Sequence, residues 1–148
     1  MNLRAITPAF LLLASGVVSG SQVPAEKLRI IAVSGPTVVA FYAFDQTHPV
    51  AAEANAESDE TLGDFQFYAA KDRDLLRLRG IQFQEVYALS FQIQIGNRKW
   101  LVKADQFKCG VGYYFIAPGK QPHIENGVMT DEDLRQVADR FFESSKTK

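Results

Sequence analysis

The sequence is poor in cysteine, in long apolar runs and in excess charge of either sign. A single cysteine among 148 residues excludes an intramolecular disulfide, and a chain of this length can bury a workable core without one. No apolar run reaches the ~20 residues that a membrane-spanning helix needs, which excludes a polytopic membrane protein and predicts no stable membrane anchor. Lys and Arg number 16 against 17 Asp and Glu, so no basic field drives nonspecific nucleic-acid binding.

The rest of the composition is typical of a soluble globular protein. The chain is 47% hydrophobic and 22% charged, which excludes a collagen-like or mostly disordered protein. It contains no internal repeat and no linker, and its length suits one domain. We expect that domain over residues 22–143, followed by a frayed tail over residues 144–148.

Residues 1–21 have the composition of a secretory signal peptide. Arg4 is the only charge in this stretch, and residues 9–18 are apolar or small. Gly16 and Gly20 both suit the last position before a cleavage site. The alternative is a buried first strand of a cytosolic protein. Cleavage would place the protein outside the cell or in the ER lumen, and the absence of a retention tetrapeptide favours secretion.

The hydropathy pattern of the remaining chain predicts alternating helices and strands. In the first half we expect a helix from Pro24 to a stop at Gly35, a strand buried on both faces over 37–43, a helix over 49–62, a strand over 64–70, and a helix capped by Asp72 that stops at Gly80. In the second half we expect a hairpin over 86–104 with its turn at Gly96-Asn97, a strand over 112–116, a turn at Pro118-Gly119, an edge strand over 122–126, and a helix over 130–142 capped by Thr130.

This order of elements resembles the thioredoxin-like family, which includes thioredoxin and protein disulfide isomerase type domains. Residues 35–43 look like the segment that leads into that family's active site, and residues 65–81 look like its next strand and short helix. Residues 113–142 look like its closing hairpin and last helix. The resemblance implies an α/β fold with a central mixed sheet flanked by helices and an inserted β-hairpin near 84–107. A rival alignment makes that hairpin the closing pair and residues 110–143 an extension.

The dithiol chemistry that the resemblance implies is missing. A Cys-x-x-Cys motif is expected after the buried strand, where a helix N-terminus stabilises the thiolate. The loop at this position instead contains Asp45, Gln46, Thr47, His48 and Pro49. Ala40 stands where the family carries a buried acid, and no proline lies near Val111-Gly112, where its groove-lining cis-proline would fall. We therefore expect no dithiol–disulfide exchange, no cofactor and no enzymatic activity of that kind.

Cys109 is the one remaining thiol and the only weak catalytic candidate. A lone cysteine is commonly a small buried hydrophobe. A surface thiol here would instead permit a mixed disulfide, a homodimer linked through Cys109, or single-thiol glutathione or peroxide chemistry. Asp45 and His48 suit an ordinary loop better than an acid–base pair, and His48 and His123 alone predict no metal site.

Aromatic residues make up 11% of the chain, and several belong to the predicted hairpin. If these aromatic side chains are exposed, they form an interaction surface. If the hairpin extends the sheet, they are buried. The candidate binding residues are Tyr87, Phe91, Trp100, Phe107, Val111 and Gly112. The sequence thus favours a redox-inactive secreted or lumenal module that binds a protein or peptide. The alternatives are a single-cysteine thiol enzyme and a small secreted protein that acts on a host or neighbouring cell.

Overall fold

The computed structural model describes residues 28–43 and 62–143, and the side chain of Cys109 is outside this description. The described residues form a mixed α/β fold with two sheets and two α-helices. Its elements, in chain order, are β1 (Arg29–Ala32), β2 (Thr37–Tyr42), α2 (Leu62–Leu78), β3 (Gln82–Tyr87), β4 (Ser90–Ile95), β5 (Arg98–Lys103), the 3₁₀ turns η1 (Ala104–Gln106) and η2 (Lys108–Gly110), β6 (Val111–Ile116), β7 (His123–Asn126), α3 (Asp131–Ala138) and the π-helical turn η3 (Asp139–Glu143).

The main sheet has the order β3-β2-β6-β7, and all six residues of both β2 and β6 are buried. β2 pairs with β3 in parallel and with β6 antiparallel, while β7 pairs antiparallel with β6 at the edge. This arrangement confirms the buried strand, the strand after Cys109 and the short edge strand that the sequence predicts. Because β6 pairs directly with β2, the chain after residue 110 belongs to the main sheet and is not an extension of it.

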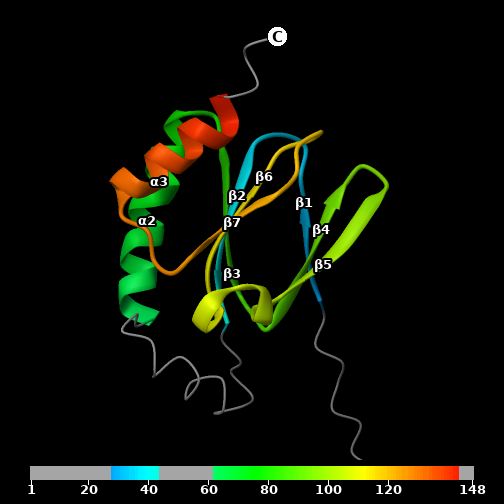
Figure 1. Ribbon diagram of the computed structural model, residues 1–148, viewed down its shortest axis with the longest axis horizontal. Helices are drawn as coiled ribbons and strands as arrows, with labels where there is room; N and C mark the ends of the chain where they lie inside the picture. The colour runs from blue at the N-terminus through cyan, green and yellow to red at the C-terminus, as the bar shows by residue number, and fades with distance from the viewer. Residues whose placement is uncertain (1–27, 44–61, 144–148) are drawn as a thin grey trace, which may run out of the picture.

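The second sheet has the order β1-β4-β5 and lies on one face of the main sheet, while α2 and α3 cover the other face (Figure 1). The predicted hairpin is confirmed as β4–β5, with Gly96 at its turn in a left-handed conformation of φ 55°. Phe91 and Ile93 of β4 face the main sheet and are fully buried. The hairpin is shorter than the predicted stretch of residues 84–107, because residues 84–87 belong to β3.

Two predicted elements are wrong. Residues 29–32 form a strand and not a helix, because β1 pairs in parallel with β4 and buries Ile31 between the sheets. Residues 64–70 are the start of α2 and not a strand, so Asp72 lies inside a helix and caps nothing. The buried residues Phe65, Ala69, Asp72 and Leu76 follow helical spacing, but the charge at Asp72 interrupts the apolar stripe in the sequence.

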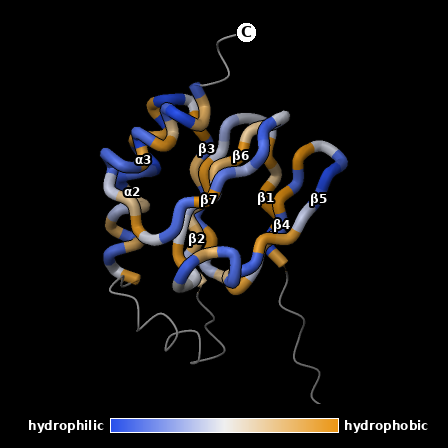
Figure 2. The backbone as a smooth tube through the Cα atoms, in the orientation of Figure 1, coloured by the Kyte–Doolittle hydropathy of each residue, from blue (hydrophilic) through white to orange (hydrophobic). Residues whose placement is uncertain are grey.

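The last helix is confirmed, with its capping contact. Thr130 has an extended backbone and its hydroxyl oxygen accepts a hydrogen bond from the Asp133 backbone N–H at 3.3 Å. α3 packs Leu134, Val137 and Ala138 against the main sheet, and the chain continues as η3 with Phe141 and Phe142 at the same cluster. Figure 2 shows the resulting distribution, with apolar strands at the centre and hydrophilic stretches along the helices and the end of the β4–β5 hairpin.

Candidate functional site

One hollow lies between the end of the β4–β5 hairpin and the turn that joins β6 to β7. We call it the tip hollow; it has a volume of about 530 Å³ and is lined by Ile95, Arg98, Lys99, Trp100, Tyr114 and residues 119–122. At its floor, the Trp100 indole N–H donates a hydrogen bond to the Tyr114 hydroxyl at 3.1 Å. This bond joins the second sheet to the main sheet, since Trp100 belongs to β5 and Tyr114 to β6.

The charge around the tip hollow is of one sign. Arg98, Lys99 and Lys120 line it, and no acidic residue does. Lys120 is engaged elsewhere, because its ammonium donates to the backbone carbonyl of Phe141 and lies 5.2 Å from the centre of that ring. Within the described ranges, Arg98 and Lys99 form neither an ion pair nor a side-chain hydrogen bond. The hollow therefore presents cations without a neutralising partner.

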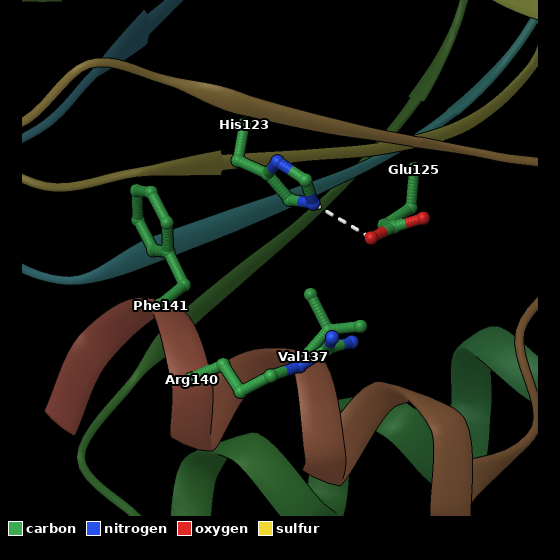
Figure 3. Close-up of a pocket in the computed structure, with 5 residues that line it drawn as sticks. All are labelled: His123, Glu125, Val137, Arg140 and Phe141. Carbon is green, nitrogen blue, oxygen red and sulfur yellow. Dashed lines mark hydrogen bonds and ion pairs between the residues drawn. The ribbon is translucent and has the colours of Figure 1, made fainter. Parts of the chain in front are cut away.

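A second hollow lies between β7 and the C-terminal part of α3 (Figure 3). It has a volume of about 250 Å³ and is lined by His123, Glu125, Val137, Arg140 and Phe141. The Nε2 atom of His123 lies 2.6 Å from a carboxylate oxygen of Glu125, and the His123 ring stacks on Phe141 with ring centres 6.2 Å apart. Among the described residues that line this hollow, none carries a nucleophilic side chain.

The most perturbed ionisable group lies between α2 and the main sheet. Asp72 is fully buried, and one of its carboxylate oxygens accepts a hydrogen bond from the Tyr113 hydroxyl at 3.0 Å. Its other oxygen, Oδ1, has no hydrogen-bond partner among the described residues. Burial raises the pKa of Asp72 from 3.8 to about 7, an effect that Asp131 reinforces and that the Tyr113 bond and Lys71 oppose. Asp72 lines neither of the two hollows described above.

The residues predicted from the missing dithiol motif are only partly visible. The loop with Asp45, Gln46, Thr47, His48 and Pro49 lies outside the described residues. Ala40 is buried in the core on the helical side of the main sheet. Cys109 lies in η2, and the neighbouring Gly110 carbonyl accepts a hydrogen bond from the Ala43 N–H at 2.8 Å. The backbone around Cys109 is therefore adjacent to the end of β2.

Most of the predicted aromatic surface is core. Phe91 and Val111 are fully buried, Phe107 is 3% exposed, and Phe107 stacks on Phe41 with ring centres 4.8 Å apart. Gly112 is also buried. These four residues therefore offer no surface to a partner. Tyr87 and Trp100 are half-buried, and Trp100 lines the tip hollow.

The Tyr87 side chain is hydrogen-bonded to Glu85, two residues earlier on β3. Its hydroxyl donates to the Glu85 carboxylate at 2.8 Å, and burial, together with this bond, raises its pKa to about 12.

No helix in the described ranges has the length and apolarity needed to cross a membrane. No group of three or more His, Cys, Asp or Glu side chains in that part of the chain is arranged to hold a metal ion. Comparison of the chain with protein-family models, with curated proteins and with solved structures gives no match.

Sequence reasoning missed several members of the tip hollow. The sequence predicts only that Tyr114 lies in the strand over 112–116, and it gives Arg98 and Lys99 no role. One signal was present: the hairpin strand begins Arg98-Lys99-Trp100, which places two cations beside the only tryptophan. The sequence does not show that this strand and the turn at residues 119–122, about 20 positions later, line the same hollow.

The bond between Trp100 and Tyr114 gives a first prediction. Tyr114→Phe leaves the half-buried indole N–H without its acceptor and is expected to lower the free energy of unfolding by about 1 kcal/mol. Because Trp100 is the only tryptophan, the folded protein should also change its fluorescence emission maximum. Urea unfolding and emission spectra measure both effects. Tyr68→Phe, on α2, is the matched control, and identical emission from the two variants would contradict the assigned contact.

Proposed function

We propose that this chain is a redox-inactive, thioredoxin-like domain, secreted or lumenal, that binds a protein or peptide partner through its β1-β4-β5 sheet. The order of the elements supports the family assignment, because β2, α2, β3, the β6–β7 hairpin and α3 follow one another as buried strand, helix, strand, closing hairpin and last helix. The lack of a second cysteine supports redox inactivity. The compartment depends on the composition of residues 1–21 alone.

The observation that carries the binding role is the outer face of the β1-β4-β5 sheet. We call it the hairpin face and define it by Ile30, Gln92, Leu101 and Lys103, which point away from the main sheet. Ile30 is 52% exposed and Leu101 is 41% exposed, and both lie directly opposite Gln92 on neighbouring strands. No element in the described part of the chain packs on this face (Figure 1).

Apolar exposure is concentrated at this sheet. Leu28 and Leu89, which directly precede β1 and β4, are also exposed, at 39% and 42%. On the helical layer the exposed large apolar residues are Phe67 and Leu78, which lie eleven positions apart on α2. Contiguous apolar surface marks interaction sites, whereas scattered single residues are ordinary.

The mode of contact follows from the edge strand. β5 is the outer strand of its sheet and carries Arg98, Lys99 and Lys103, and charged residues of this kind protect an edge from pairing with another strand. A partner is therefore expected to contact the face of the sheet by its side chains and not to extend the sheet by backbone pairing.

Peptide display on the protein purified from a secreting host tests this proposal. We expect enriched peptides whose binding falls at least tenfold in an Ile30→Ser, Leu101→Ser double variant. Leu78→Ser, which alters a leucine on α2 that is 85% exposed, is the control and should bind as the parent does. Circular dichroism checks that each variant is folded. Failure to enrich any peptide, or equal loss in the control, would contradict the binding role of the hairpin face.

The redox part of the proposal has its own test. We expect no turnover in an insulin-disulfide reduction assay, because the chain cannot form the internal disulfide that a dithiol cycle needs. Sustained turnover that is lost in Cys109→Ser would overturn this part of the proposal and favour a single-thiol enzyme.

A further inference from the structure

We infer that the tip hollow receives an acidic peptide segment of the partner, with a carboxylate held between Arg98, Lys99 and the Tyr114 hydroxyl. This inference rests on the proposed function, because it names the chemistry of the partner that the β1-β4-β5 sheet binds. It also adds a second site, since the tip hollow lies between the two sheets and the hairpin face lies on the opposite side of β4 and β5.

The first argument is the distribution of charge between the layers of the fold. The strands β1, β4 and β5 contain the basic residues Arg29, Arg98, Lys99 and Lys103 and no acidic residue. The whole chain carries a net charge of −1, so this sheet is positive within a slightly acidic protein. A surface with this sign attracts and orients an acidic partner.

The second argument is the pairing state of the cations. On the helical layer, arginines have acidic partners: Arg73 pairs with Glu85, and Arg79 pairs with both Asp139 and Glu143. Arg98 and Lys99 have no such partner in the described ranges, although both line the hollow. A carboxylate placed there meets two cations without first breaking an ion pair.

The third argument is a hydrogen-bond donor at the floor of the hollow. The Tyr114 oxygen accepts the Trp100 indole N–H, which leaves the hydroxyl proton to be donated. Burial raises the pKa of Tyr114 above its ordinary value, so the hydroxyl stays protonated at neutral pH. Ile95, Trp100 and Pro122 supply apolar walls against which the methylene groups of a glutamate side chain can pack.

The size of the hollow suits part of a peptide. A volume of about 530 Å³ lies within the ~300–1,000 Å³ range of ordinary ligand sites, which is room for a few side chains and not for a folded element. The same cations would also meet a nucleic acid or a sulfated polysaccharide. We commit to an acidic peptide because the basic group is small and the walls beside it are apolar.

A titration with hexaglutamate, followed by Trp100 fluorescence at low salt, tests the inference. We expect saturable binding that weakens as salt is raised, and no binding of hexalysine. The double variant Arg98→Gln, Lys99→Gln should weaken binding at least tenfold. Lys71→Gln, Arg77→Gln removes the same charge from α2 and should leave the dissociation constant within about twofold of the parent. Both altered sites are exposed, so neither variant should lose its fold.

The outcomes separate this inference from the proposed function. Absence of hexaglutamate binding, or equal weakening in both double variants, overturns the inference. Binding of heparin or of an oligonucleotide without binding of hexaglutamate also overturns it. If displayed peptides bind through Ile30 and Leu101 while Arg98→Gln, Lys99→Gln has no effect on them, the proposed function stands and the inference is wrong.

Discussion

Asp72→Asn is expected to remove most of the pH dependence of the free energy of unfolding between about pH 4 and pH 7. In the folded protein burial raises the pKa of Asp72 to about 7, whereas in the unfolded chain the carboxyl ionises near its ordinary value of 3.8. Between these values the unfolded chain releases a proton that the folded chain keeps. The contribution of Asp72 to the free energy of unfolding is therefore greatest below about pH 4, and it is lost as pH rises through the folded-state pKa of about 7.

The size of the effect follows from the difference between the two pKa values. A difference of about three units corresponds to roughly 4 kcal/mol of stability lost over this range. The asparagine carbonyl can still accept the Tyr113 hydroxyl, but its amide group takes the place of the unpartnered Oδ1 and is itself left without an acceptor. We therefore expect Asp72→Asn to be slightly less stable than the parent at pH 4 and clearly more stable at pH 8.

Urea unfolding at a series of pH values measures this prediction. Asp74→Asn, an exposed carboxyl two positions away on α2, is the control and should follow the parent curve closely. If parent and Asp72→Asn show parallel curves, the carboxyl is not desolvated in the folded state and the assigned packing of α2 on the sheet is wrong.

Gly112→Ala is the second substitution with a large expected effect. Gly112 lies opposite Asn126 where β6 meets the edge strand. A Cβ atom there would collide with the backbone carbonyl oxygen of Glu125 and would lie 2.6 Å from a ring carbon of Phe107. Since the carbonyl belongs to the paired strand, it cannot move without breaking the pairing. We expect a loss of about 3 kcal/mol or more in the free energy of unfolding.

Gly35→Ala provides the matched control. A Cβ atom at Gly35 has no heavy atom within 4 Å, and the position does not need a left-handed backbone. The same substitution should therefore be neutral or stabilise the protein by about 0.5 kcal/mol, since it reduces the freedom of the unfolded chain. Thermal or urea unfolding of the two variants compares them directly, and equal stability would contradict the close approach of β6 and β7.

Elements with an uninterrupted local pattern could be predicted from the sequence. Local residue patterns predict three elements: the apolar run predicts β2, the alternation around Phe91 and Ile93 predicts β4, and the capped apolar stripe predicts α3. The interior of α2 could not be predicted in this way, because the buried Asp72 gains its place only through Tyr113, which lies 41 positions later. β1 likewise depends on its pairing with β4.

The candidate site was less predictable than the fold. Trp100 was identified from its place in the hairpin, and it does line the tip hollow. The same reasoning names Phe91 and Phe107, which are buried, since a sequence pattern does not show which face of a hairpin is covered by a second sheet. Val111, which is also buried, is named only by the resemblance to the thioredoxin-like family. Tyr114 and Lys120 enter the hollow only because β6 and the following turn pack beside the hairpin.

Mapping the amide resonances of the folded protein during titration with a display-selected peptide tests the central claim most directly. The account predicts shifts concentrated in β1, β4 and β5, with further shifts at the tip hollow when the peptide is acidic. Resonances of α2 and α3 should stay in place. Shifts centred on the helices, or spread evenly over the protein, would contradict a partner surface on the β1-β4-β5 sheet.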